Sequence, residues 1–165
     1  MKSCSASAKN SWMELAANIK PNYFVTIAFN LPIKRCFSNT ISAERFYRAQ
    51  LKKIIGRLDK KLVGKNYLKE CRKQFRCEGL AIPEHIASNG HYHILLRYTR
   101  CDLESFKKAL SIVLNGLHMD FVTYDVQLID DLKPLERYCF KEYNSSLHND
   151  ISTRFIILSE FHSTL

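Results

Sequence analysis

The feature that most constrains this chain is a pair of apolar segments joined by a short polar one. Residues 75–82 (FRCEGLAI) and 91–98 (HYHILLRY) flank the sequence PEHIASNG at 83–90. Both flanking segments are rich in aliphatic and aromatic residues, which predicts two strands. The dipeptide Asn89-Gly90 is typical of a hairpin turn. The sequence therefore predicts an antiparallel strand pair.

Further strands and helices are expected on both sides of this hairpin. β-branched and aromatic runs or alternating patterns predict three more strands, at residues 23–29, 122–128 and 154–158. Ser42 and Asp102 are candidate amino-terminal caps of two amphipathic helices, and Pro134 suits the first position of a shorter helix. The order β-α-β-β-α-β-α-β predicts an α+β fold with a mainly antiparallel five-stranded sheet. The helices are expected to pack on this sheet in a ferredoxin-like layout.

The length of 165 residues suits one domain, which we place at residues 21–165. Residues 1–20 are small and polar, and we expect a tail or a short docking helix there. No apolar run approaches the roughly 18 residues of a membrane-spanning helix, and the polar start does not resemble a signal peptide. We therefore expect an intracellular, cytoplasmic protein without membrane association. The six cysteines form no Cys-x-x-Cys pair, which argues against a structural zinc site of the usual spacing.

Positive charge is concentrated in one part of the chain. The net charge is +9, and residues 34–76 alone carry 14 basic and three acidic residues, so the other 122 residues sum to −2. On the helix expected after Ser42, the basic residues fall largely outside the apolar stripe. The candidate contacts to a polyanion are Arg45, Arg48, Lys52, Arg57, Lys60 and Lys61. Charge alone is compatible with nucleic acid, an anionic membrane or a solvated helix face.

Two histidines are spaced so that both could bind the same metal ion. His91 and His93 alternate with Tyr92 on the expected strand, so both imidazoles point to one face with Cα atoms roughly 6.6 Å apart. Imidazoles at this spacing can bind one metal ion, which usually needs a third ligand. Glu84 across the hairpin is the natural third ligand, and Glu78 and His85 are weaker candidates. The alternative is two unrelated histidines, one of them in the core.

A candidate nucleophile follows near the end of the expected short helix. Tyr138 and Lys141 lie three residues apart, so they would share a helix face. A tyrosine hydroxyl is a weak nucleophile at its ordinary pKa near 10, and a neighbouring ammonium favours the phenolate. The alternative is a tyrosine that packs on the sheet beside a solvated lysine.

Together, three segments resemble the motifs of the HUH endonucleases, which nick single-stranded DNA. FVTIAFN at 24–30 resembles the first motif, PEHIASNGHYHILL at 83–96 the second, and RYCFKEY at 137–143 the third. Tyr143 lies five residues from Tyr138, which departs from the two-tyrosine initiators and indicates a single-tyrosine enzyme.

The resemblance implies that His91, His93 and Glu84 hold Mg²⁺ or Mn²⁺, while Tyr138 attacks the DNA and Lys141 orients the tyrosine or the phosphate. The expected function is nicking at a replication origin or hairpin, which initiates rolling-circle replication, with any helicase or host replication protein as a separate partner. The expected role of the basic helix is to grip DNA beside the cutting centre. A transposase or relaxase of the same superfamily, a non-enzymatic nucleic-acid-binding module and a zinc hydrolase are the alternatives.

Overall fold

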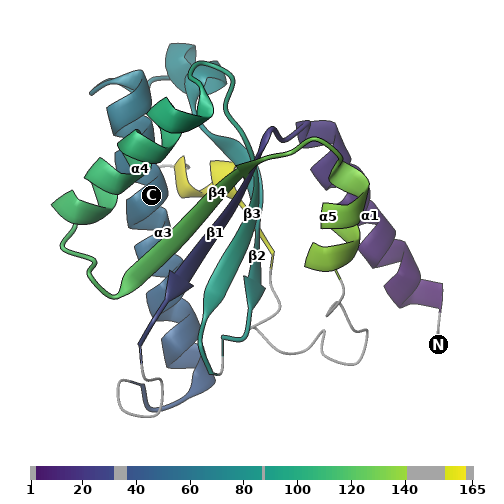
Figure 1. Ribbon diagram of the computed structural model, residues 1–165. Coiled ribbons are helices and arrows are strands. Elements are labelled where there is room, and N and C mark those ends of the chain that lie inside the picture. The colour runs from purple at the N-terminus through teal and green to yellow at the C-terminus, as the bar shows by residue number, and fades with distance from the viewer. Residues whose placement is uncertain (1–2, 32–36, 87, 141–154, 163–165) are drawn as a thin grey trace.

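The computed structural model describes residues 3–31, 37–86, 88–140 and 155–162 (Figure 1). Its centre is a five-stranded antiparallel sheet in the order β4-β1-β3-β2-β5. The strands are β1 (Tyr23–Phe29), β2 (Glu78–Glu84), β3 (His91–Arg97), β4 (Val122–Leu128) and β5 (Ile156–Ile157). The expected α+β class and five-stranded antiparallel sheet are confirmed.

Helices cover both faces of this sheet (Figure 1). Helices α3 (Thr40–Val63) and α4 (Leu103–Gly116) pack on one face, where the larger core forms around Tyr92 and Ile94 of β3. Helices α1 (Ser3–Ile19) and α5 (Leu132–Cys139) pack on the other face, over a smaller core that includes Leu95. Because β3 side chains alternate between the two cores, the faces of the sheet have different partners.

The hairpin differs from the expected one in both strands and turn. Strand β2 begins at Glu78 because the preceding residues form the 3-10 helix η1 (Glu70–Phe75). It then continues through Pro83, which lies beyond the two β2 residues that pair with β5. A proline is tolerated there because, among the described residues, β2 has no ladder partner on that side.

The hairpin turn has a different geometry from the two-residue turn that Asn-Gly usually forms. The connection spans residues 85–90, and the positive φ of 52° is at His85 instead of Gly90. Gly90 has another reason to be glycine: a Cβ there would lie 2.4 Å from the Tyr47 ring of α3. The glycine therefore allows the hairpin to approach α3 closely.

Helix boundaries follow side-chain caps, not all of which were expected. Helix α3 is capped by Asn39, whose Oδ1 accepts a hydrogen bond from the Ser42 N–H at 2.8 Å, so the expected cap at Ser42 is wrong by three residues. Asp102 caps α4 as expected and accepts from the Ser105 N–H at 2.7 Å. Asp131 caps α5, so Pro134 lies at the third helical position, where its missing N–H still costs no intrahelical bond.

The amino-terminal segment forms a longer helix than the sequence indicates. Helix α1 starts at Ser3, and its Trp12 and Ala16 pack against the smaller core. At the other end, β5 is shorter than the expected strand at 154–158, because Leu158 begins the 3-10 helix η4 (Leu158–His162). In the described part of the chain, no helix has both the length and the apolar character needed to cross a membrane.

Candidate metal centre

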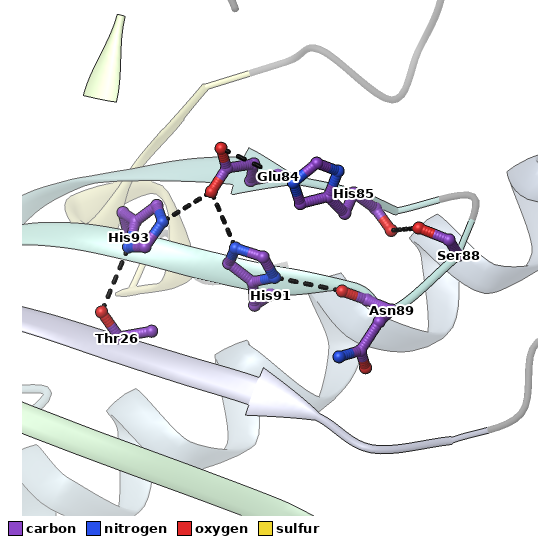
Figure 2. A network of polar contacts seen from close by, with 7 residues as sticks. All are labelled: Thr26, Glu84, His85, Ser88, Asn89, His91 and His93. Carbon is purple, nitrogen blue, oxygen red and sulfur yellow. Dashed lines mark hydrogen bonds and ion pairs between the residues drawn. The ribbon is translucent and has the colours of Figure 1, made fainter. Parts of the chain in front are cut away.

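Three side chains of the β2–β3 hairpin converge on one point (Figure 2). Glu84 Oε2 lies 2.7 Å from His91 Nε2 and 2.7 Å from His93 Nε2. One ligand atom of each residue lies within 4.8 Å of the other two, so the group could hold a metal ion. Glu84 and His93 are buried and His91 is partly buried, so the group is set into the surface.

The sheet register brings these three residues together. Glu84 pairs directly with His91 across the ladder, and His93 lies two residues further along β3, on the same face. Neither weaker candidate takes this place: Glu78 lies at the far end of β2, 3.5 Å from the Arg97 guanidinium. The ring of His85 is exposed, and its Nε2 lies 3.8 Å from the second oxygen of Glu84.

Hydrogen bonds behind the rings orient both imidazoles. His91 Nδ1 lies 3.0 Å from the Asn89 carbonyl oxygen, which can only accept, so Nδ1 must carry a proton. In a neutral His91 ring, Nε2 is therefore the unprotonated nitrogen, and it points at Glu84. His93 Nδ1 lies 3.1 Å from Thr26 Oγ1, a hydroxyl that can donate or accept. Such outer partners are typical of metal-binding histidines.

The close approach of these atoms indicates a site for positive charge. A carboxylate oxygen and an unprotonated imidazole nitrogen repel at 2.7 Å unless a proton or a cation lies between them. Metal ions bind nitrogen and oxygen at about 2.0–2.2 Å, which is compatible with neighbouring ligand atoms at this separation. Three protein ligands also leave coordination positions for water or substrate. The residues present therefore fit a divalent ion.

A tyrosine from the neighbouring helix lies against this group. The Tyr138 ring of α5 is 5.3 Å from the His93 ring, at an interplanar angle of 70°, and the side chain is 43% exposed. The His93 ring also stacks on Phe24 of β1, at 5.4 Å. Cys139 and Phe140 anchor the end of α5 in the smaller core. The structure thus places Tyr138 in contact with His93, one of the three candidate ligands.

Lys141 and Tyr143 lie outside the described residues. Helix α5 ends at Cys139, before Lys141.

The basic helix does not lie beside the metal centre, in contrast to our expectation. The apolar stripe of α3 packs in the core that contains Tyr92 and Ile94, whereas His91 and His93 point to the opposite face of β3. Arg48 forms an ion pair with Glu160 at 2.9 Å. The other candidate contacts are all exposed on the outer side of α3: Arg45, Lys52, Arg57, Lys60 and Lys61. Hydrophobic patterning orients the helix, but it does not determine which sheet face receives it.

Two residues that orient the histidines were missed as functional residues in the sequence. Thr26 is the one polar side chain of β1, YFVTIAF, in positions otherwise occupied by apolar residues or tyrosine. Its position opposite His93 in the β1–β3 ladder gives it this role. Asn89 contributes through its backbone carbonyl, for which side-chain chemistry gives no signal.

Comparisons with protein-family models, curated proteins and solved structures found no match.

Proposed function

We propose that this protein is a metal-dependent endonuclease that nicks and rejoins single-stranded DNA through a covalent 5′-phosphotyrosine. The observation that carries the proposal is the contact between Tyr138 and His93, whose rings are 5.3 Å apart. It places an accessible hydroxyl-bearing side chain next to a group that fits a divalent ion. The resemblance of the three sequence segments to HUH endonucleases supports the same chemistry.

The proposed reaction exchanges one phosphoester bond for another. Tyr138 Oη attacks the phosphorus, a bond forms between them, and the bond from phosphorus to the 3′ oxygen breaks. The tyrosine proton is lost and the departing 3′ oxygen gains one, so the products are a 5′-phosphotyrosine and a free 3′-hydroxyl. Because the number of phosphodiester links is unchanged, the reverse reaction can rejoin the strand. The free 3′-hydroxyl can prime synthesis, which suits initiation of rolling-circle replication; strand transfer in transposition or conjugation is the alternative.

Glu84, His91 and His93 would hold the ion in this scheme. When bound, a divalent ion supplies Lewis-acid stabilisation of the charge that develops on phosphate oxygens. Two imidazoles and one carboxylate suit Mn²⁺ better than Mg²⁺, which prefers oxygen ligands. Thr26 and the Asn89 carbonyl orient the two rings so that each Nε2 faces Glu84.

The test is formation of a denaturant-stable adduct with labelled single-stranded DNA in the presence of Mn²⁺. Tyr138→Phe should abolish the adduct, since phenylalanine keeps the ring contact with His93 but lacks the attacking oxygen. Tyr124→Phe is the matched control, because Tyr124 is 37% exposed and lies on a strand at the edge of the sheet. An adduct of wild-type yield in Tyr138→Phe would remove Tyr138 from the mechanism.

The same assay separates the proposal from its rivals. Cleavage that persists in Tyr138→Phe without an adduct would favour a hydrolase that activates water. DNA binding that is unaffected by a chelator, with no cleavage under any condition, would favour a non-enzymatic binding module.

A further inference from the structure

A second surface of the molecule has the character of a polyanion-binding site. It is formed by six exposed cations on the carboxyl-terminal half of α3 and the turn that follows, which we name the basic surface: Lys52, Lys53, Arg57, Lys60, Lys61 and Lys65. Among the described residues, no ion pair joins any of the six to an acidic side chain. The one acidic residue in this stretch, Asp59, is fully buried and lies against His162 instead. The positive charge of the basic surface is therefore uncompensated.

The basic surface borders two hollows, both lined by Arg57 and Lys60. Arg57 and Lys60 border a groove of about 620 Å³ on the side of Lys53 and Lys65. The same two residues border a hollow of about 310 Å³ between α3 and the end of α4 at Gly116. Gly56 lies in the wall of the larger groove, where a side chain would take up space. Concave cationic surfaces concentrate anions more strongly than flat ones.

This surface lies behind the sheet as seen from the metal centre. The buried side of α3 packs on the Tyr92 face of β3, and the basic surface is on the outer side of that helix. A DNA segment on the basic surface is therefore separated from Tyr138 by a helix layer and the sheet (Figure 1). The two sites cannot contact the same nucleotide.

We propose that the basic surface binds the phosphate backbone of double-stranded DNA without reading its sequence. From Lys53 to Lys61 the helix rises about 12 Å, a length that spans about three to four phosphates of one duplex strand. Single-strand sites usually add aromatic stacking platforms. Among the described residues that line the two hollows, Tyr67 is the only aromatic, and its ring already contacts the His162 ring at 6.2 Å. The basic surface thus offers charge without stacking.

An anionic membrane fits this surface less well. Surface-bound helices insert an apolar face between lipids. The apolar residues of α3 are already in the core, with Leu51, Ile54 and Leu58 at most 1% exposed. The choice of DNA over RNA rests on the proposed function, whereas the duplex-binding surface itself does not require any nicking activity.

The experiment measures binding of a labelled blunt DNA duplex at several salt concentrations, with chelator present so that no nicking occurs. The test variant is Lys53→Gln/Arg57→Gln/Lys60→Gln, because glutamine keeps the helix propensity of these exposed positions. Each lost phosphate contact lowers the slope of log affinity against log salt by about 0.9, so the slope should fall by about two to three. The matched control is Lys20→Gln/Lys108→Gln/Lys133→Gln, which removes three exposed cations outside the basic surface. Its slope should stay within about 0.5 of wild type.

An unchanged slope in the test variant, or an equal fall in the control, would overturn the proposal. The choice of partner would be overturned if the test variant lost more affinity for single-stranded DNA, or for vesicles of anionic lipid, than for the duplex. Failure of the nickase is distinguishable, because a protein that forms no tyrosine adduct would still show the duplex slope in chelator.

Discussion

At the scale of single residues, the metal centre depends on groups that hold its ligands as much as on the ligands. The His93 ring stacks on Phe24 and makes an edge contact with Tyr138, and its Nδ1 lies 3.1 Å from Thr26 Oγ1. His91 is oriented by the Asn89 carbonyl. These contacts fix which nitrogen of each ring faces Glu84. The rings are therefore already oriented before an ion binds, and binding does not have to restrict their rotation.

Thr26→Val tests this orienting role. Valine has the same shape and suits a strand, but it leaves His93 Nδ1 without its hydroxyl partner. Loss of such an outer partner typically costs about 10–100-fold in metal affinity. We expect a fall of that size in Mn²⁺ binding measured by calorimetry, with an unchanged far-ultraviolet circular dichroism spectrum.

Thr123→Val on β4 is the control for that experiment, because the Thr123 hydroxyl is hydrogen-bonded to Asn30 at 3.1 Å and not to a histidine. Wild-type Mn²⁺ affinity in Thr26→Val would show that the hydroxyl does not orient His93.

At the scale of the elements, the hairpin is positioned by its contact with α3. Phe29 N–H donates to the Gly90 carbonyl at 2.9 Å, and Gly90 itself lies against the Tyr47 ring. His91 is the next residue after Gly90, so this contact sets the position of the first histidine of the site. The elements on one face of the sheet thus influence the site on the other.

Gly90→Ala should therefore disturb both stability and metal binding. The added Cβ would lie 2.4 Å from the rigid Tyr47 ring, so the hairpin or the ring must move. Overpacking of this kind costs about 1–3 kcal/mol, which should appear as a lower urea midpoint together with weaker Mn²⁺ binding.

Gly116→Ala is the control, because a Cβ at the end of α4 meets no atom within 4 Å. It should leave the urea midpoint unchanged or raise it slightly, since alanine is the better helix former. Equal behaviour of the two variants would contradict the close contact at Gly90.

The elements differ in how well local sequence patterns predict them. Alternation and cap residues predict β1, β3, β4 and α4 almost to the residue, because these signals are local. The Asn-Gly dipeptide predicts a turn correctly, although the glycine is needed for packing instead of a positive φ. Which face of the sheet receives α3 depends on long-range packing, and for that reason the basic helix was wrongly expected beside the site. The convergence of Glu84, His91 and His93 was predictable, because the alternation of side chains along a strand and a single hairpin turn are enough to bring them to one face of the sheet.

At the scale of the whole molecule, a buried polar cluster joins the end of the described chain to its centre. Asp59 of α3 is fully buried, its Oδ1 accepts from the Cys77 N–H at 2.7 Å, and its Oδ2 lies 2.9 Å from His162 Nε2. Burial, and secondly the nearby Asp59 carboxylate, raise the pKa of the Cys77 thiol well above its ordinary value, so this cysteine stays protonated and structural. The cluster connects α3, the start of β2 and η4.

Asp59→Ala should destabilise the whole fold without altering the metal centre directly. It removes one member of a buried pair, leaves the Cys77 N–H without its acceptor and leaves His162 without the neighbouring carboxylate, a change that typically costs about 3–5 kcal/mol. Urea unfolding of Asp59→Ala, His162→Ala and the double variant measures the coupling. The two losses should be less than additive, since each single variant already breaks the same ion pair. Strict additivity would show that Asp59 acts through Cys77 alone and that η4 is held by Leu158 and Phe161 in the core. In either case the Mn²⁺ affinity of the folded variants should match wild type, because the cluster packs on the side of the sheet opposite to His91 and His93.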